Sequence, residues 1–121
     1  PVYVMPEYST KWQMWGGVTP ETIEKAFAKT PDAKAVLLVS PTYYGLCSDL
    51  QAIAEICHCH NAALLVDEAH GSHLYFSEQL PLGALESGAD ACAQSIHKTA
   101  GSFTQRPPIC RWYRVHHRPT F

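Results

Sequence analysis

The stretch "AALLVDEAHGSH", residues 62–73, decides the fold of this 121-residue chain. Its first five residues, 62–66, are all apolar, and "AVLLV" at residues 35–39 has the same character. Continuous apolar runs of this length are typical of parallel strands that are buried on both faces. These two runs therefore predict neighbouring strands covered by helices on each side. Shorter apolar runs at residues 2–5 and 91–94 predict two further strands.

Amphipathic segments with helix start signals separate these runs. One helix is expected to begin at Thr19, which can cap it, with Pro20 in the first helical position. The next has Ser48 and Gln51 at the spacing of a capping box. A third, shorter helix is expected over residues 81–87. Strands that alternate with helices predict an α/β fold with an open, mostly parallel sheet.

Polar side chains follow three of the predicted strands at their carboxyl ends. The three clusters are residues 40–45, residues 67–73 and residues 95–99. Open α/β sheets bind their ligands at the carboxyl ends of the strands. Three clusters on one edge of the sheet therefore predict a binding or catalytic site there.

Lys98 is one of five lysines, and it lies among alanine, serine and glycine residues. Because an unpaired buried charge costs several kcal/mol, one interpretation is a structural ion pair between Lys98 and Asp67. The nearby donors Ser95, His97 and Thr99 would instead suit a phosphate. An acid, a group of phosphate donors and an amine together match the needs of pyridoxal phosphate. We favour this cofactor, and the ion pair and phosphate-only binding stay open.

Composition argues against several classes of function. The formal net charge of −2 gives no reason to expect nucleic acid or a membrane surface as partner. No apolar run approaches the ~20 residues of a membrane span. An odd count of five cysteines indicates thiols in a reducing compartment, so we expect a cytoplasmic protein. The sequence "CHCH" at residues 57–60 offers metal-ligating types, but adjacent helical positions point in different directions, so no metal site is predicted.

The composition changes abruptly near the C-terminus. All four arginines and three prolines lie within residues 106–121. We interpret residues 1–105 as part of one domain and residues 106–121 as an atypical tail. This tail is either a basic binding segment or, as we favour, a frame-shifted or scrambled terminus, which could be disordered.

Residues 36–73 and 80–105 closely resemble the major domain of the bacterial ornithine/lysine/arginine decarboxylases. These are pyridoxal-phosphate enzymes of fold type I, the aspartate-aminotransferase fold. The resemblance extends over residues 1–105 and rests on long stretches in order, beyond the short "DEAH" and "HK" signatures. It implies that Lys98 binds the cofactor as a Schiff base and that Asp67 pairs with the pyridinium nitrogen.

The resemblance also implies roles for the neighbouring residues. Ala69 would pack against one face of the cofactor ring, and His70 would lie near its phenolic oxygen as a second catalytic residue. Ser95 and His97 would approach the phosphate. Thr42 would face the side of the ring that carries the phenolic oxygen and the lysine linkage.

The implied reaction is decarboxylation of arginine, lysine or ornithine to the corresponding amine, within polyamine metabolism. The parent enzyme would be a homo-oligomer that acts on a small-molecule substrate. The family segments that supply the phosphate loop and the aromatic residue stacked on the ring are absent from this sequence, so we expect little or no activity from this chain alone. The alternatives are another fold type I enzyme, such as a cysteine desulfurase or an aminotransferase, and a non-catalytic remnant.

Overall fold

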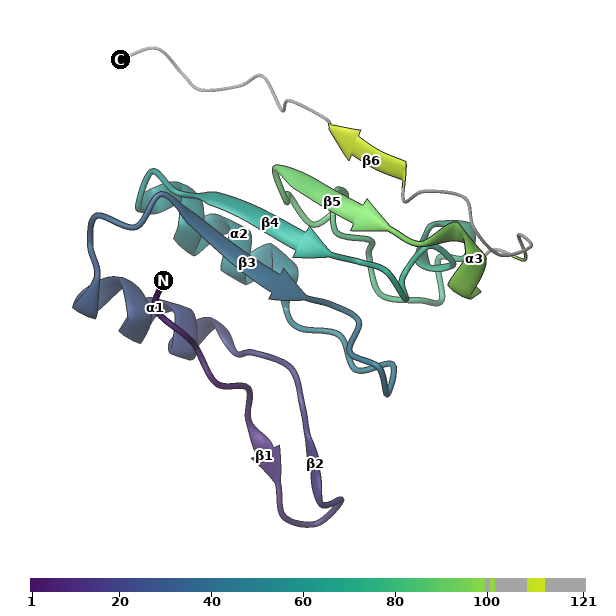
Figure 1. The fold of residues 1–121 in the computed structure, drawn as a ribbon, viewed down its shortest axis with the longest axis horizontal. Helices are drawn as coiled ribbons and strands as arrows, with labels where there is room; N and C mark the ends of the chain where they lie inside the picture. Colours follow the sequence, from purple (N-terminus) through teal and green to yellow (C-terminus); the bar gives the residue numbers. More distant parts are fainter. Residues whose placement is uncertain (100, 102–108, 113–121) are drawn as a thin grey trace.

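The computed structural model describes residues 1–99, 101 and 109–112 (Figure 1). The short N-terminal strands precede a region in which strands and helices alternate. In chain order the elements are β1 (Tyr8–Ser9), β2 (Met14–Trp15), α1 (Pro20–Lys29), β3 (Ala35–Val39), α2 (Leu50–Cys59), β4 (Ala63–Asp67), a 3-10 turn η1 (Leu74–Phe76), β5 (Ala91–Gln94), α3 (Ile96–Thr99) and β6 (Ile109–Trp112).

The main sheet has the strand order β3-β4-β5-β6. Strands β3, β4 and β5 are parallel, whereas β6 runs antiparallel to β5. In the pairing register Val39 lies beside Asp67, and Asp67 lies beside Ala93. The three parallel strands therefore end side by side, which confirms the predicted α/β fold with a mostly parallel sheet.

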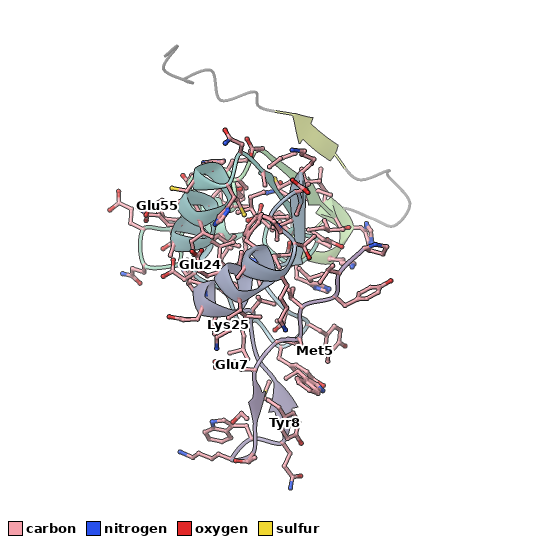
Figure 2. The ribbon with its side chains drawn as sticks, turned by 90° about the vertical axis from the view of Figure 1, so that its left-hand side faces the viewer. Met5, Glu7, Tyr8, Glu24, Lys25 and Glu55 are labelled. Atoms are coloured by element: carbon pink, nitrogen blue, oxygen red, sulfur yellow. The ribbon has the colours of Figure 1, made fainter. Side chains whose placement is uncertain are left out.

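Helices α1 and α2 pack together on one face of this sheet (Figure 1). Figure 2 shows Glu24 and Glu55 projecting from the outer side of these helices, where both are exposed to solvent. Apolar side chains on the inner side form the core because their burial removes nonpolar surface from water. The most buried of them are Ile23 and Phe27 of α1, Ile53 and Cys57 of α2, and Leu64 and Val66 of β4.

The opposite face of β3 is uncovered in the part of the chain that the structure describes. Leu37 is 70% exposed and Val39 is 56% exposed. The prediction that helices cover β3 on both faces is therefore wrong for these residues. The reason is that both long helices pack on the face that carries Leu38, which is buried.

The helix caps confirm one prediction and correct another. Thr19 caps α1 by accepting a hydrogen bond from the backbone N–H of Thr22 at 3.4 Å. The cap of α2 is Asp49, whose Oδ1 accepts from the N–H of Ala52 at 3.1 Å, rather than Ser48. Ser48 Oγ instead accepts from the N–H of Val18 at 3.1 Å, and so joins the start of α2 to the segment before α1.

The helix predicted over residues 81–87 is a single turn. It is closed by a bond from Ser87 N–H to the carbonyl of Gly83 at 2.9 Å and ends at Gly88, which has a φ of +94°. In this turn, the N–H groups of Ala84 and Leu85 donate hydrogen bonds to the side chains of Glu68 and Tyr75. Pro81 lies two residues before Gly83, outside any helix. The run is therefore too short to propagate beyond one turn.

The N-terminal segment differs from its prediction as well. Residues 2–5 form no strand; Val4 packs against the core, whereas Val2 and Met5 are exposed. The first strands are instead β1 and β2, an antiparallel pair that projects away from the main sheet (Figure 2). The rings of Tyr8 and Trp15 face each other edge to face across this pair, with centroids 5.0 Å apart.

The atypical tail predicted at residues 106–121 lies outside the described residues, except for β6. Strand β6 pairs with β5 from Gln94–Ile109 to Ala91–Trp112. The predicted disorder and the predicted change of reading frame stay predictions. Among the described residues, no helix is both long and apolar enough to cross a membrane.

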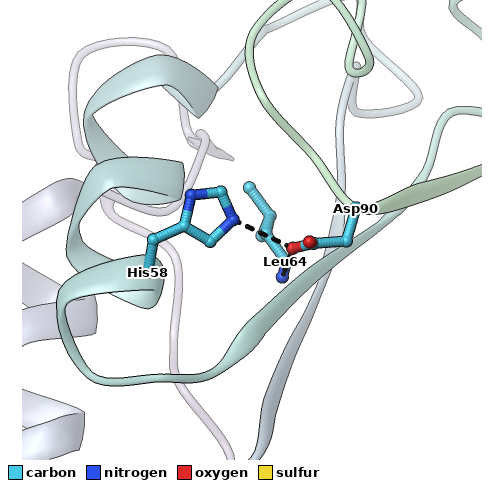
Figure 3. A network of polar contacts seen from close by, with 3 residues as sticks. All are labelled: His58, Leu64 and Asp90. Atoms are coloured by element: carbon cyan, nitrogen blue, oxygen red, sulfur yellow. Dashed lines mark hydrogen bonds and ion pairs between the residues drawn. The ribbon is translucent and has the colours of Figure 1, made fainter. Parts of the chain in front are cut away.

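Asp90 joins the start of β5 to β4 (Figure 3). Its Oδ2 accepts from the backbone N–H of Leu64 at 2.8 Å and lies 3.0 Å from Nε2 of His58. The backbone N–H of Asp90 also donates to the carbonyl of Leu64 at 2.9 Å. The carboxylate therefore satisfies the N–H of a residue whose side chain is fully buried.

We expect Asp90→Ala to destabilise the chain more than His58→Ala. Loss of the carboxylate leaves the Leu64 N–H without its partner, which costs about 1–3 kcal/mol. The ion pair with His58 is partly exposed, so its loss costs about 0–1 kcal/mol. Urea unfolding of both variants measures the difference, and equal losses would contradict the assigned role of Asp90.

The four residues 57–60 lie in different surroundings. Cys57 is buried, His58 faces Asp90, and the ring of His60 stacks on Phe27 at a centroid distance of 4.3 Å. Cys59 is exposed. Burial raises the pKa of the Cys57 thiol to about 11, and the negative charge of Asp90 adds to the rise.

We expect Cys59 to react with iodoacetamide well before Cys57. The thiolate is the reactive form, and the raised pKa keeps Cys57 protonated until the pH approaches about 11. Peptide mass spectrometry after timed labelling at several pH values measures both rates. Equal labelling at pH 8 in the folded chain would contradict this prediction.

Candidate functional site

The site lies at the carboxyl edge of the sheet, where β3, β4 and β5 end (Figure 1). Backbone bonds hold the three ends together beyond the strands themselves. The N–H of Ser40 donates to the carbonyl of Asp67 at 3.1 Å, and the N–H of Glu68 donates to the carbonyl of Ala93 at 2.8 Å. The loops that follow the strands therefore leave the sheet from adjacent positions.

His70, in the loop after β4, lies close to Lys98 of helix α3. Nζ of Lys98 lies 3.4 Å from Nε2 of His70, within hydrogen-bond distance. The ring of Tyr43, from the loop after β3, faces the His70 ring edge to face at a centroid distance of 5.7 Å. The imidazole of His70 thus touches groups from both neighbouring segments.

Asp67 ends β4 at the same edge and is partly buried. Its Oδ1 accepts from the N–H of Ala69 at 3.0 Å, which fixes the carboxylate over its own turn. Among the described residues, no ion pair joins Asp67 to Lys98. The structural ion pair considered from the sequence is therefore not formed here.

The other predicted residues lie near these but make fewer contacts. Oγ1 of Thr42 accepts from the N–H of Leu46 at 3.2 Å and so shapes the loop after β3. Ser95 is partly buried, and its carbonyl accepts from the N–H of Lys98 at 3.1 Å. His97 is exposed. Their assignment to a phosphate or to the ring of a cofactor stays a prediction.

A fully buried carboxylate that the sequence interpretation missed lies behind the site. Glu68 is 0% exposed, and its oxygens accept from the Tyr75 hydroxyl at 2.9 Å, from Nε2 of Gln94 at 2.6 Å and from the Ala84 N–H at 2.7 Å. We call these four residues the Glu68 network. The available signal was the strand period of two, by which Glu68 points opposite to Asp67.

The charge of Glu68 affects its buried neighbours. Burial raises the pKa of the Tyr75 hydroxyl, and the hydrogen bond and negative charge of Glu68 raise it further. The hydroxyl in turn accepts from the N–H of Leu85 at 3.3 Å. Burial, with a contribution from Glu68, also raises the pKa of the Cys47 thiol. The network therefore holds Tyr75 in its neutral, donating form.

A further side-chain bond joins the loop that carries His70 to helix α3, which carries Lys98. Oγ of Ser72, which is buried, lies 2.6 Å from Oγ1 of Thr99. Residues 68, 70 and 72 thus each reach the segment 94–99. The sequence interpretation missed this contact because hydroxyl side chains are common in loops and carry no partner information.

Gly71 lies where the loop after β4 approaches the loop after β3. A Cβ at this position would come within 2.8 Å of Cδ of Pro41 and would overlap the Glu68 side chain. Both neighbours are buried, so neither has room to move away. Glycine is required here by space rather than by backbone conformation.

We expect Gly71→Ala to lower the free energy of unfolding by about 1–3 kcal/mol, the cost of overpacking a filled interior. Gly16→Ala is the matched control, because the nearest atom to its added Cβ is at an ordinary contact distance of 3.4 Å. Urea unfolding of both variants measures the effect. A Gly71→Ala variant as stable as the control would contradict the packing described here.

The parallel sheet, its helices and the strand-end site define the class of this protein: it has the fold of the type I pyridoxal-phosphate enzymes. A solved structure of mouse CSAD superimposes with a TM-score of 0.61 at 25% identity, over 79% of this chain and 20% of that one. The chain belongs to the Orn/Lys/Arg decarboxylase major-domain family, whose sequence profile matches residues 1–111.

Two curated relatives are bacterial proteins named arginine decarboxylase. Over 105 residues, or 87% of this chain, it is 47% identical to the protein of Halalkalibacterium halodurans and 43% identical to that of Bacillus subtilis. The chain spans about a fifth of the length of each relative, 21% in both cases.

The residues at the strand ends fit pyridoxal phosphate in kind. Lys98 supplies an amine that makes no ion pair among the described residues. Asp67 supplies a carboxylate with one oxygen held by its own turn. The imidazole of His70 lies in contact with the amine. The acid and the amine that this cofactor requires are thus present at one edge of the sheet, with an imidazole beside the amine.

Proposed function

We propose that this chain carries the cofactor lysine of a pyridoxal-phosphate-dependent decarboxylase that acts on a basic amino acid. The observation that carries the proposal is the contact of Lys98 with His70, in the segments that follow the adjacent parallel strands β5 and β4, of which β4 ends at Asp67. Family membership supports the reaction class. The names of the relatives make arginine the first substrate to test, before lysine and ornithine.

Each residue of the site has a separate task in this proposal. Lys98 binds the cofactor covalently, which requires its neutral amine. Asp67 holds a proton on the pyridine nitrogen by its negative charge. Ala69 leaves room for the ring, because its side chain is a single methyl group. When bound, the cofactor supplies a sink for the electron pair that remains as carbon dioxide leaves.

The remaining residues bind and orient. His70, next to Lys98, is proposed to lie beside the phenolic oxygen and to hold or accept a proton there. Ser95 and His97 are proposed to donate hydrogen bonds to the phosphate. Thr42 is proposed to face the same side of the ring as Lys98. We also propose that residues 1–105 are the part of the chain that belongs to the decarboxylase domain.

The protein as a whole is proposed to act in the cytoplasm as a homo-oligomer, on the pathway that makes polyamines. The odd number of five cysteines supports a reducing compartment. A non-catalytic role is the second candidate. In that role the chain would act by assembling with a larger protein. The exposed Leu37 and Val39 favour such assembly, because an apolar sheet face requires covering by further protein.

We expect the chain to form a covalent adduct with pyridoxal 5'-phosphate at Lys98 and at no other lysine to a comparable extent. The adduct is fixed by borohydride reduction and located by peptide mass spectrometry. Lys98→Ala should abolish it, whereas the matched control Lys34→Ala, at an exposed lysine remote from the site, should leave it unchanged. Asp67→Asn should reduce its yield, because the negative charge next to the ring is lost.

Amine release from arginine, lysine and ornithine is measured in parallel. An adduct at Lys98 with little amine release is the expected result for this chain. Substantial release that depends on Lys98 would show that the chain alone is sufficient for catalysis. Labelling spread evenly over the five lysines would contradict the proposed site and favour the non-catalytic role.

A further inference from the structure

Glu68 carries a buried charge without a basic partner among the described residues. Its side chain is 0% exposed and accepts three hydrogen bonds, from Tyr75, Ala84 and Gln94. A buried ionised group is expensive unless hydrogen bonds satisfy it. An apolar side chain of similar volume would fill this space without the cost of desolvating a carboxylate. A role in positioning other residues therefore explains the presence of Glu68 better than a contribution to stability does.

The bonds of Glu68 join four separate parts of the chain. Glu68 itself follows β4, Tyr75 lies in η1, Ala84 begins the single turn before β5, and Gln94 ends β5. The bond to Gln94 is the shortest of the three, at 2.6 Å. It is also the only one of the three that reaches the strand leading directly into the segment of Lys98.

The position of Glu68 places this bond next to the site residues. Asp67 and Ala69 are the sequence neighbours of Glu68, and Ser95 is the residue after Gln94. Two residues further along the loop, His70 reaches Lys98 at 3.4 Å. A change in the distance between Glu68 and Gln94 would therefore shift the His70 imidazole relative to the Lys98 amine.

We propose that Glu68 is a positioning residue, which through its bond to Gln94 sets the placement of His70 against Lys98. This inference rests on the proposed function for its catalytic meaning, since His70 and Lys98 are the groups that it would position. The Ala84 N–H holds the other carboxylate oxygen of Glu68 at 2.7 Å, so the side chain keeps an anchor when the Tyr75 hydroxyl is removed. The bond to Gln94 transmits that placement to the segment that carries Lys98.

The test compares two variants that each remove one partner of Glu68. Gln94→Leu removes the hydrogen bond between Gln94 and Glu68 and keeps a side chain of similar volume. Tyr75→Phe is the matched control, because it removes a bond of the same carboxylate but leaves the Gln94 contact in place. Glu68→Gln is the third variant, because an amide cannot accept all three hydrogen bonds. Urea unfolding of each variant gives its loss of stability.

The first readout needs no cofactor. The five lysine amines are labelled competitively with acetic anhydride, and peptide mass spectrometry gives the reactivity of Lys98 relative to the other four. We expect this ratio to change in Gln94→Leu and Glu68→Gln, because the contact with His70 is altered. In Tyr75→Phe it should stay close to that of the unsubstituted chain.

The second readout is the rate of the pyridoxal 5'-phosphate adduct at Lys98. We expect a decrease of about tenfold or more in Gln94→Leu, the scale of effect that misplacement of a reacting group by less than 1 Å can produce. Tyr75→Phe should show a smaller decrease even where its loss of stability is equal or greater. Equal decreases that follow stability alone would overturn the positioning role.

The two proposals fail in different ways. If the unsubstituted chain forms no adduct at Lys98, the proposed function fails, and the positioning role is then judged on the reactivity ratio. If the adduct forms but the ratio and rate are the same in Gln94→Leu and Tyr75→Phe, the positioning role fails and the proposed function stands. A Glu68→Gln variant that does not fold leaves this decision to Gln94→Leu.

Discussion

The parallel pairing of β3, β4 and β5 is the constraint on which the site depends. A shift of one residue in the register of β4 would exchange the faces of Asp67 and Glu68 and turn the Asp67 carboxylate toward the interior. The register is fixed at both ends of the strand. Asp90 binds the backbone of Leu64 at the start, and Glu68 donates its backbone N–H to Ala93 at the end.

The core beneath the sheet and the site above its edge are built differently. Helices α1 and α2 bury aliphatic and aromatic side chains against β4, and this packing needs only size and apolar character. At the carboxyl edge, side-chain hydrogen bonds hold the segments together. The Glu68 network and the bond of Ser72 to Thr99 give directional contacts, which loops need because they lack the regular pairing of a strand.

Much of this arrangement could be predicted from the sequence. The uninterrupted apolar runs predicted β3 and β4, and Thr19 with Pro20 predicted the start of α1. The residues that could not be predicted depend on contacts distant in sequence. Ser48 has the right type to cap α2 but bonds to Val18, 30 residues earlier, so Asp49 caps the helix.

The covering of β3 and the partners of Glu68 were missed for the same reason. An apolar run does not say which segment covers each of its faces, and Leu37 is exposed despite its type. A carboxylate in a loop is usually solvated, and only the fold brings Tyr75, Ala84 and Gln94 around Glu68. The resemblance to a family supplied the roles of Lys98 and Asp67, which local patterns left open.

The opposite orientations of Asp67 and Glu68 have a consequence for how this protein can change over evolutionary time. Two adjacent positions carry carboxylates in different surroundings: Asp67 is partly buried at the end of its strand, whereas Glu68 faces inward and is fully buried. A substitution of Asp67 removes one hydrogen bond, which lies within its own turn. Any replacement of the inward one must be accompanied by changes in η1, in the turn before β5 and in β5 itself.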